Sequence, residues 1–282
     1  MQSNLDQRVF LYTASGPTWT DLTPKVNEWT SGQAAIVAME PGDYLYIGCF
    51  LPFNHKYFKL STASILERTP IIEILNAPNE WSQVVDQIDY TNGMQQSGVL
   101  QWTPNFDKNW GLVTDSSRDI TALSGGPTVY GAYWLRISFA ASTSMSIDYI
   151  GQRFSSDDEL YQEYPMLKAP AILTGWKAGK TDWADQHLTA ACYIGKELVQ
   201  RNILLTNQQI LDIATLRSAA VHKTAHVIYS GLGVKNYSEE IKAALSAYSE
   251  AMNLDRFQVD TNANARKDRH EVSMNTTSRA TR

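Results

Sequence analysis

Two histidines spaced four residues apart, His222 and His226, are the clearest candidate metal ligands in the sequence. On a helix this spacing places both imidazoles on one face, where they can chelate zinc. The hydrolytic form of the motif has a glutamate directly after the first histidine, but this chain has Lys223 there. Because zinc also needs a third protein ligand, we interpret the pair as packing or surface histidines and predict no metal site.

Two other segments match catalytic or cofactor-binding motifs in residue type only. Asp157, Asp158 and Glu159 are adjacent, so on a helical turn their carboxylates point in different directions and suit a helix N-terminus better than a reaction centre. Gly179-Lys180-Thr181 ends like a phosphate-binding loop. Only three residues separate Gly175 from Gly179, however, where that loop needs four. We therefore predict no nucleotide and no other cofactor.

Hydrolysis of a glycan would need two carboxylates facing each other across a cleft. Glu73, Asp86 and Asp89 are candidates for such a pair, but nothing in the sequence brings any two of them together. Acid–base chemistry requires a placed partner as well as a carboxylate, so the sequence predicts no catalytic residue and a protein that is not an enzyme.

Aromatic residues are dense in the N-terminal half, which holds six of the eight tryptophans. Exposed tryptophan and tyrosine rings stack on sugar rings, and a group of them would make a glycan-binding surface. The core of a β-sandwich uses the same residue types, so the sequence leaves both interpretations open.

Composition places these residues in a two-domain protein. A chain of 282 residues, 43% of them hydrophobic, is long enough for two ordinary domains with separate cores. The first 152 residues carry 8 basic and 14 acidic side chains, and the rest carry 16 and 15, so the acidity belongs to the N-terminal half.

The chain lacks the sequence signals of membrane insertion and export. No apolar run approaches the roughly 18 residues of a membrane span, and the N-terminus has no basic patch before an apolar stretch. We expect a protein that, if made in a bacterium, stays in the cytoplasm and has no membrane partner. Cys49 and Cys192 are far apart and predict small buried side chains rather than a disulfide.

The N-terminal half has the alternating pattern of β-strands. In the segment 133–139, Tyr133, Leu135, Ile137 and Phe139 face one side while Arg136 and the other even positions face the opposite side. Further strands are predicted by similar runs at residues 8–12, 34–39, 43–50, 56–60, 71–75, 84–90, 98–102 and 145–150, separated by turn residues at 41–43, 91–93 and 124–127. This spacing predicts an antiparallel β-sandwich or jelly roll over residues 1–152.

The period becomes helical after Phe154. Ser156 is placed to cap a helix that begins with three acids, and Pro165 and Pro170 then interrupt the chain. Three longer amphipathic helices follow. The first opens at Thr181 and ends near residue 202, the second runs from residue 206 or 212 to 229, and the third starts at a capping box of Asn236 and Glu239. We predict an α-helical bundle over residues 153–257 and an α+β multidomain chain.

The last segment, residues 258–282, has almost no large apolar residues and cannot form a core of its own. We predict an extended C-terminal arm that is ordered only by a partner. Five basic side chains are its candidate partner-binding residues: Arg266, Lys267, Arg269, Arg279 and Arg282. Their excess over the acidic residues of the segment is small, so binding to a neighbouring protein is favoured over binding to DNA.

The stretch from Ser155 to about Arg269 resembles the head-to-tail connector, or adaptor, family of tailed bacteriophages. Four segments carry the resemblance, each weak alone but moderately specific in this order. They are Asp-Asp-Glu-Leu-Tyr-Gln-Glu-Tyr-Pro at 157–165, Asp-Trp-Ala-Asp-Gln-His-Leu at 182–188, the helix from Leu216 to Tyr229, and a helix with Tyr237, Tyr248 and Ala251 that leads into Leu254-Asp255.

The resemblance implies a non-enzymatic virion protein of the phage neck. Such a subunit forms a homo-oligomeric ring, typically a dodecamer, beneath the portal protein, and its arm reaches the next neck or tail-terminator ring. DNA passes through the lumen without specific binding. The N-terminal half departs from a minimal adaptor, although its strand 133–137 resembles sandwiches of phage structural proteins more loosely. We expect that half to bind a collar, a fibre or the capsid rim, and the alternative function is a fibre-attachment or glycan-binding adhesin.

Overall fold

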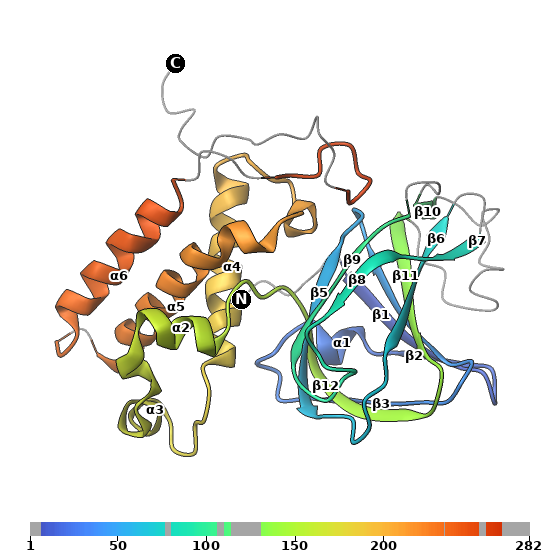
Figure 1. Cartoon of the computed structure of the whole chain (residues 1–282), viewed down its shortest axis with the longest axis horizontal. Coiled ribbons are helices and arrows are strands. Elements are labelled where there is room, and N and C mark those ends of the chain that lie inside the picture. Colours follow the sequence, from blue (N-terminus) through green and yellow to red (C-terminus); the bar gives the residue numbers. More distant parts are fainter. Residues whose placement is uncertain are drawn as a thin grey trace. The chain divides into compact units, whose positions relative to one another are not determined.

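The computed structural model describes residues 7–76, 80–105, 110–113, 131–233, 235–253 and 258–266. Within these residues the chain forms two compact units (Figure 1). The first holds residues 7–151 together with Asn262–Arg266, and the second holds residues 152–261. The described part contains two antiparallel sheets and six α-helices, an α+β composition.

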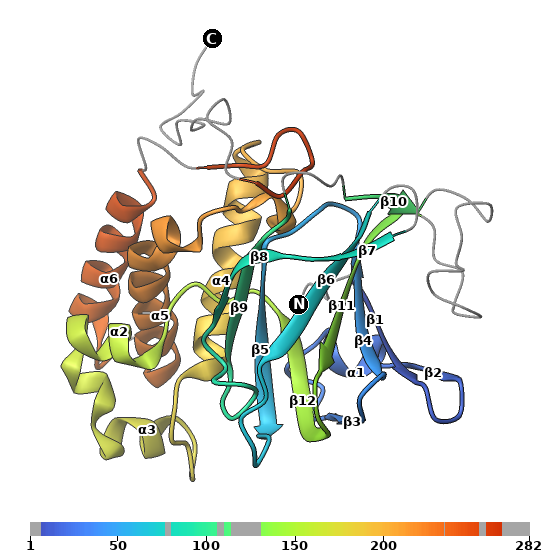
Figure 2. The same ribbon diagram turned by 45° about the vertical axis from the view of Figure 1, so that its right-hand side comes forward.

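The first unit consists of the two sheets and one short helix, α1 (Thr23–Val26). The seven-stranded sheet has the order β2 (Thr18–Asp21), β1 (Gln7–Thr13), β4 (Tyr44–Cys49), β11 (Ala132–Phe139), β6 (Pro70–Asn76) and β7 (Glu80–Gln83), with β10 (Leu112–Val113) also paired to β11. The five-stranded sheet has the order β3 (Ala35–Met39), β12 (Thr143–Gly151), β5 (His55–Thr62), β9 (Gly98–Thr103) and β8 (Val85–Asp89). Figure 2 shows both sets of strands from a second side.

One hydrophobic cluster joins the two sheets. The predicted alternation of β11 is confirmed, because Leu135, Ile137 and Phe139 are buried in this cluster and Tyr133 packs against it. Val37 of β3 and Ile147 of β12 enter the same cluster from the five-stranded sheet. Every strand run predicted from the sequence contains a strand, because the period of two places alternate side chains in this core.

Three strands were not predicted, and all of them are short. β2 and β7 have four residues each and β10 has two. The predicted run at 84–90 is also divided: Val84 separates β7 of one sheet from β8 of the other, and Asp86 has a φ of 49°. The predicted turn at 124–127 lies outside the described residues.

The second unit is helical. Its elements are α2 (Asp157–Glu163), η2 (Pro165–Lys168), α3 (Pro170–Trp176), α4 (Ala184–Gln200), η3 (Asn207–Gln209), η4 (Ile213–Leu216), α5 (Arg217–Leu232) and α6 (Ser238–Ala251). α5 supplies side chains to both hydrophobic clusters of this unit, with Ala219 and Ala220 in one and Ala225 and Ile228 in the other.

The predicted cap of α2 is confirmed. The Ser156 side chain accepts the backbone N–H of Glu159, whose carboxylate accepts the N–H of Ser156 in turn. The predicted interruptions at the two prolines are confirmed, because α2 ends at Glu163 and a non-helical residue precedes each proline. Pro165 and Pro170 each begin a short helix, since a first-turn residue needs no N–H and proline already has a helical φ.

The predicted capping box at Asn236 was also wrong. The residue before α6 is Tyr237, which makes no side-chain cap. Its ring instead lies 5.5 Å from the ring of Tyr229 on α5, so packing of the two aromatic rings fixes this helix start.

The beginning of the C-terminal arm packs against this chain itself, where the sequence predicted that only a partner would order it. Val259 is buried and forms a β-bridge with Ile210, and the backbone N–H of Asp260 donates to Gln209 at 2.9 Å. Ala265 is buried in the core of the first unit. The physical reason is that backbone hydrogen bonds and small buried side chains can order a segment that has almost no large apolar residues.

No helix among the described residues is both long and apolar enough to cross a membrane.

A glycine at the centre of the seven-stranded sheet makes room for the largest side chain of that sheet. Gly48 on β4 is paired with Trp134 on β11. A Cβ atom at position 48 would lie 2.8 Å from the Trp134 ring, closer than carbon atoms tolerate, and Trp134 is fully buried. The indole therefore depends on the missing side chain.

We expect Gly48→Ala to lower the free energy of unfolding by about 1–3 kcal/mol, because the added methyl overpacks a buried ring. Denaturant unfolding monitored by tryptophan fluorescence measures the change. The control is Gly175→Ala in α3, where an added Cβ meets nothing within 4 Å and unfolding should be unchanged or harder. Equal stabilities for Gly48→Ala and the wild type would contradict the argument.

Candidate functional sites

The outer face of the seven-stranded sheet is covered by aromatic rings. We call this surface the aromatic face and define it by Phe10, Tyr12, Trp19, Tyr44, Tyr46, Trp81 and Trp134. These residues alternate along their strands with the core residues, so they point away from the cluster shared by the two sheets. The seven-stranded sheet is therefore apolar on both sides.

The rings of the aromatic face form a continuous row. The centroids of Tyr12 and Trp19 are 5.0 Å apart, those of Trp19 and Tyr46 are 4.9 Å apart, and those of Tyr46 and Trp81 are 5.6 Å apart. Tyr46 in the middle is buried, whereas Tyr12, Trp19 and Trp81 are partly exposed. The ring in the middle of the row is therefore inaccessible to solvent, whereas the rings on either side of it are partly accessible.

A charged pair lies within these rings. The guanidinium of Arg136 stacks 4.2 Å from the Tyr44 ring and 4.5 Å from the Trp81 ring. Its Nε and Nη2 donate to the two carboxylate oxygens of Glu73 at 2.7 and 3.0 Å. Burial raises the pKa of Tyr46 to about 12, although the neighbouring Arg136 opposes the shift.

This arrangement suits binding rather than reaction. Partly exposed rings offer apolar faces, and an arginine–carboxylate pair held in a fixed orientation offers donors and acceptors beside them. Glu73, which the sequence analysis considered as a catalytic acid, is paired with a cation and not with a second carboxylate. Asp86 and Asp89 belong to β8 of the other sheet.

A buried hydrogen-bond network joins three helices of the second unit. His187 on α4 is 1% exposed. Its Nε2 lies 3.1 Å from Asp157 of α2, and its Nδ1 lies 2.7 Å from the hydroxyl of Ser155 and 3.2 Å from that of Thr224 on α5. The backbone N–H of Trp183 also donates to Asp157.

The protonation states in this network follow from burial. Burial lowers the pKa of His187, so the ring is neutral at pH 7. Burial alone would raise the pKa of Asp157, but hydrogen bonds from His187 and Trp183 and the charge of Arg153 lower it. A carboxylate only accepts, so Nε2 carries the proton and Nδ1 accepts the hydroxyl of Ser155.

Ser155, His187 and Asp157 have the residue types of a hydrolytic triad, but their arrangement differs from what catalysis needs. Ser155 is 6% exposed and directly precedes the cap of α2, and Thr224 uses its own proton on the carbonyl of Ala220. A nucleophile must reach a substrate. We therefore interpret the network as structural: its hydrogen bonds hold α2, α4 and α5 together.

The histidine pair lies on α5 as the spacing predicts, and its members have different surroundings. His222 bonds through Nδ1 to the Tyr164 hydroxyl at 2.8 Å. Burial lowers the pKa of both His222 and His226. Within the described part of the chain, no group of three or more His, Cys, Asp or Glu side chains is placed to hold a metal.

The remaining motif residues occupy ordinary structural positions. Gly179-Lys180-Thr181 follows helix α3 rather than a strand, and Lys180 stacks over Trp183. Cys49 is buried as predicted, whereas Cys192 on α4 is only partly buried.

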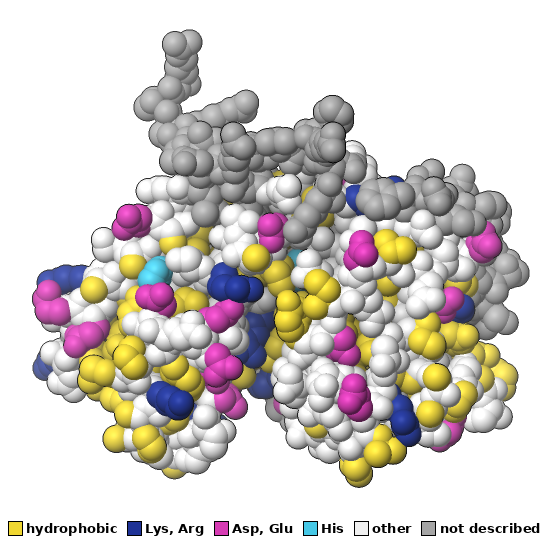
Figure 3. Space-filling model, in the orientation of Figure 1, with side chains coloured by type: hydrophobic (Ala, Val, Ile, Leu, Met, Phe, Trp, Pro, Cys, Tyr) yellow, Lys and Arg dark blue, Asp and Glu magenta, His cyan; other side chains and the backbone are white. Residues whose placement is uncertain are grey.

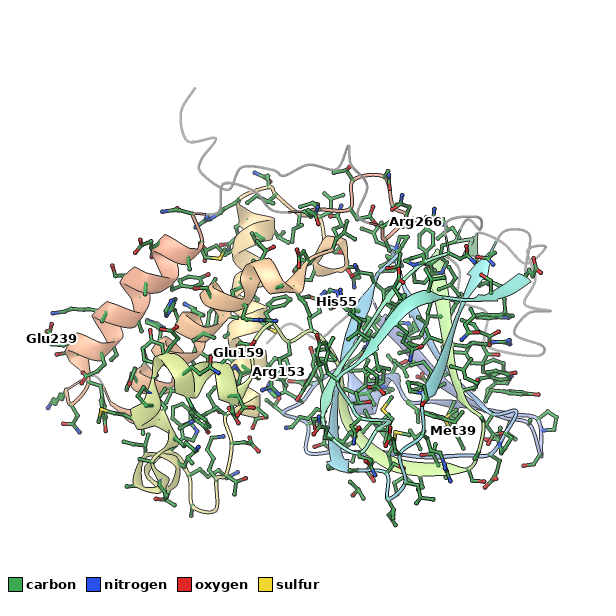
Figure 4. All side chains as sticks on the ribbon, viewed as in Figure 1. Met39, His55, Arg153, Glu159, Glu239 and Arg266 are labelled. Atoms are coloured by element: carbon green, nitrogen blue, oxygen red, sulfur yellow. The ribbon has the colours of Figure 1, made fainter. Side chains whose placement is uncertain are left out.

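Of the predicted arm residues, the structure describes Arg266 alone. Arg266 is labelled in Figure 4. Its guanidinium donates to the backbone carbonyl of Asn105 in the first unit. Lys267, Arg269, Arg279 and Arg282 lie outside the described residues.

The helical unit has exposed apolar side chains. Figure 3 shows hydrophobic side chains gathered over α2 and α3. Met166 of η2 is 69% exposed, and Leu205 between α4 and η3 is 79% exposed. Surfaces of this kind favour contact with another protein.

The aromatic face was not predicted as a site from the sequence. The sequence did contain one indication of it. Phe10 and Tyr12, and likewise Tyr44 and Tyr46, are two residues apart, so each pair of rings lies on one side of its strand. Which strands lie next to each other could not be obtained from that spacing.

Comparison with models of protein families and with curated proteins found no match to this chain.

We expect acid to weaken the second unit through His187. Its folded pKa lies below 6.5, so its contribution to stability is present above about pH 6.5 and is lost as the pH falls below that value, by at most about 1.4 kcal/mol per pH unit. Asp157 adds a further loss only in stronger acid, below its unfolded pKa of 3.8.

Thermal unfolding between pH 7.5 and 5.5 measures this dependence. His187→Gln should flatten the profile, and the control His226→Gln, which changes a less buried histidine, should leave most of the slope. If the unfolding temperature of His187→Gln still falls steeply between pH 7.5 and 5.5, other groups cause the sensitivity to acid.

Proposed function

We propose that this chain is a head-to-tail connector subunit of a tailed bacteriophage, a structural virion protein and not an enzyme. The observation that carries the proposal is the position of the four segments that resemble the adaptor family. They coincide with α2, the start of α4, α5 and α6, and these helices pack into one unit. The four segments therefore supply the helices whose side chains form the hydrophobic clusters of this unit.

The finer architecture belongs to the same proposal. The first unit would be a sandwich or jelly roll, supported by the core that its two sheets share. The second would be a bundle centred on α5, supported by the position of α5 in both of its clusters. The domains would cover residues 1–152, 153–257 and 258–282.

In this proposal the helical unit forms a ring of identical subunits between the portal protein and the next neck or tail-terminator ring. The resemblance implies twelve subunits in this ring. A closed ring uses two different faces of each subunit. Met166 lies on η2 and Leu205 lies between α4 and η3, and both are exposed, so they are candidates for such faces. The first unit would face a collar, a fibre or the capsid rim, and DNA would pass through the lumen without specific binding.

We expect Met166→Asp and Leu205→Asp each to prevent ring formation on the portal while changing the free energy of unfolding by less than about 0.5 kcal/mol, since exposed positions contribute little to folding. Cryo-electron microscopy of the protein mixed with its portal measures ring occupancy.

The matched control is Ile65→Asp, an apolar residue of the first unit that is 91% exposed. It should assemble like the wild type. Wild-type protein found only in peripheral fibres of the virion would refute the connector function.

A second function is favoured by the aromatic face. In this alternative, the chain is a fibre-attachment or glycan-binding subunit that stacks sugar rings on Trp19 and Trp81. The specific observation is that these rings stay partly exposed beside the fixed Arg136–Glu73 pair.

If this alternative holds, Trp19→Ala and Trp81→Ala in the full chain should each weaken binding on a glycan array by about tenfold or more, since one aromatic contact contributes roughly 0.5–1.5 kcal/mol beyond its buried area. Trp29→Ala is the control, because Trp29 packs edge-on against Tyr149 outside the aromatic face. Absence of any glycan binding by the wild-type chain would remove this alternative and leave the connector function untouched.

A further inference from the structure

Strand β3 is an edge of the five-stranded sheet, and its outer side has no strand beside it. It pairs with β12 alone, with Val37 opposite Met145. Every second residue of an edge strand points its backbone N–H and C=O groups away from the sheet. Within the described part of the chain, residues 35–39 make no backbone hydrogen bonds other than those with β12. A row of donors and acceptors is therefore available to another strand.

The other edge strands of the described sheets have features that discourage pairing with another chain. β2 and β7 have four residues each, and β10 has two. β8 shifts its register between Val85 and Ile88, and Asp86 between them has a φ of 49°. Short strands, bulges and charged side chains are the usual means of protecting a sheet edge.

β3 has none of these protecting features. Its sequence is Ala-Ile-Val-Ala-Met, without a charged residue, proline or glycine, and its pairing with β12 has no register shift. Ile36 in the middle of the strand is 73% exposed. A regular, apolar and exposed edge is the kind of surface to which another strand adds.

The charge pattern favours a second copy of this chain as the added partner. The first 152 residues carry 14 acidic and 8 basic side chains, so two copies repel each other over much of the surface of this half. Residues 29–39 carry no charge at all. The edge of β3 is therefore a place where two copies can approach closely without repulsion.

We propose that β3 pairs antiparallel with β3 of a second copy of this chain, which joins the two five-stranded sheets into one continuous sheet. A two-fold axis beside Val37, perpendicular to the sheet, keeps the core-facing residues of both copies on the same side. Ile36 of each copy then lies opposite Ala38 of the other. The two Glu40 carboxylates lie at opposite ends of the pairing, so no like charges face each other.

The proposed contact goes beyond the connector function and does not depend on it. A two-fold contact uses the same surface on both copies, so it makes pairs and leaves no β3 edge open for a third copy. A ring of subunits requires two different faces instead. The pairing of β3 therefore concerns the free protein, before any ring is formed.

Sedimentation velocity of the full-length protein over a range of concentrations measures the pairing. We expect a reversible equilibrium between monomer and dimer. Ile36→Lys should weaken dimer formation about tenfold or more, because it places two like charges near each other on adjacent strands. Since Ile36 is largely exposed, the variant should keep the denaturation midpoint of the wild type.

The matched control is Ile65→Lys, the same substitution at an exposed position between β5 and β6, and it should dimerise like the wild type. Hydrogen–deuterium exchange distinguishes the edge of β3 from any other contact. The amides of residues 35–39 should exchange more slowly at high protein concentration than at low concentration, whereas those of β2 and β7 should not change.

Folded wild-type protein that stays monomeric at every concentration would overturn the proposal. So would larger species in place of a dimer, because two-fold pairing stops at two copies. A dimer that forms equally well in Ile36→Lys, or that leaves the exchange of β3 unchanged, would show that the two copies meet through another surface.

Discussion

The seven-stranded sheet is apolar on both of its faces, and this constraint shapes the whole first unit. β4 shows it in three successive residues, with Leu45 in the core between the sheets and Tyr44 and Tyr46 on the aromatic face. A strand of this kind has apolar side chains on both sides, so it needs packing partners on the core side and on the aromatic face, where the rings remain only partly covered. Gly48 and Trp134 are one example, since a Cβ atom at position 48 would lie 2.8 Å from the buried Trp134 ring.

Much of the fold could be predicted because it follows from local period. The alternation in β11 predicted its inward residues, and Ser156 followed by three acidic residues predicted the start of α2. The start of α6 could not be predicted in this way. Asn236 has the better capping side chain, but Tyr237 packs on Tyr229, and a contact between two helices overrides a local preference.

The candidate sites were harder to predict because they depend on pairing across long stretches of chain. Arg136 and Glu73 were visible in the sequence as separate charges, and only the antiparallel register of β11 and β6 makes them a bonded pair. The same holds for His187, whose partners Asp157 and Thr224 lie on two other helices. Spacing along one element predicts which residues share a face, and it contains no information on which other element that face will meet.

The return of the chain to the first unit at Asn262–Arg266 makes the helical unit an insertion within the first one. Both ends of residues 152–261 are then held, one by β12 and the other by the buried Ala265. A segment with two fixed ends has fewer unfolded conformations than a segment with one, and the entropy of closing such a loop grows only with the logarithm of its length. Loss of the Ala265 contact would therefore leave the two clusters of the helical unit in place and would raise only the conformational entropy of its unfolded state, by an amount that depends weakly on the length of the segment.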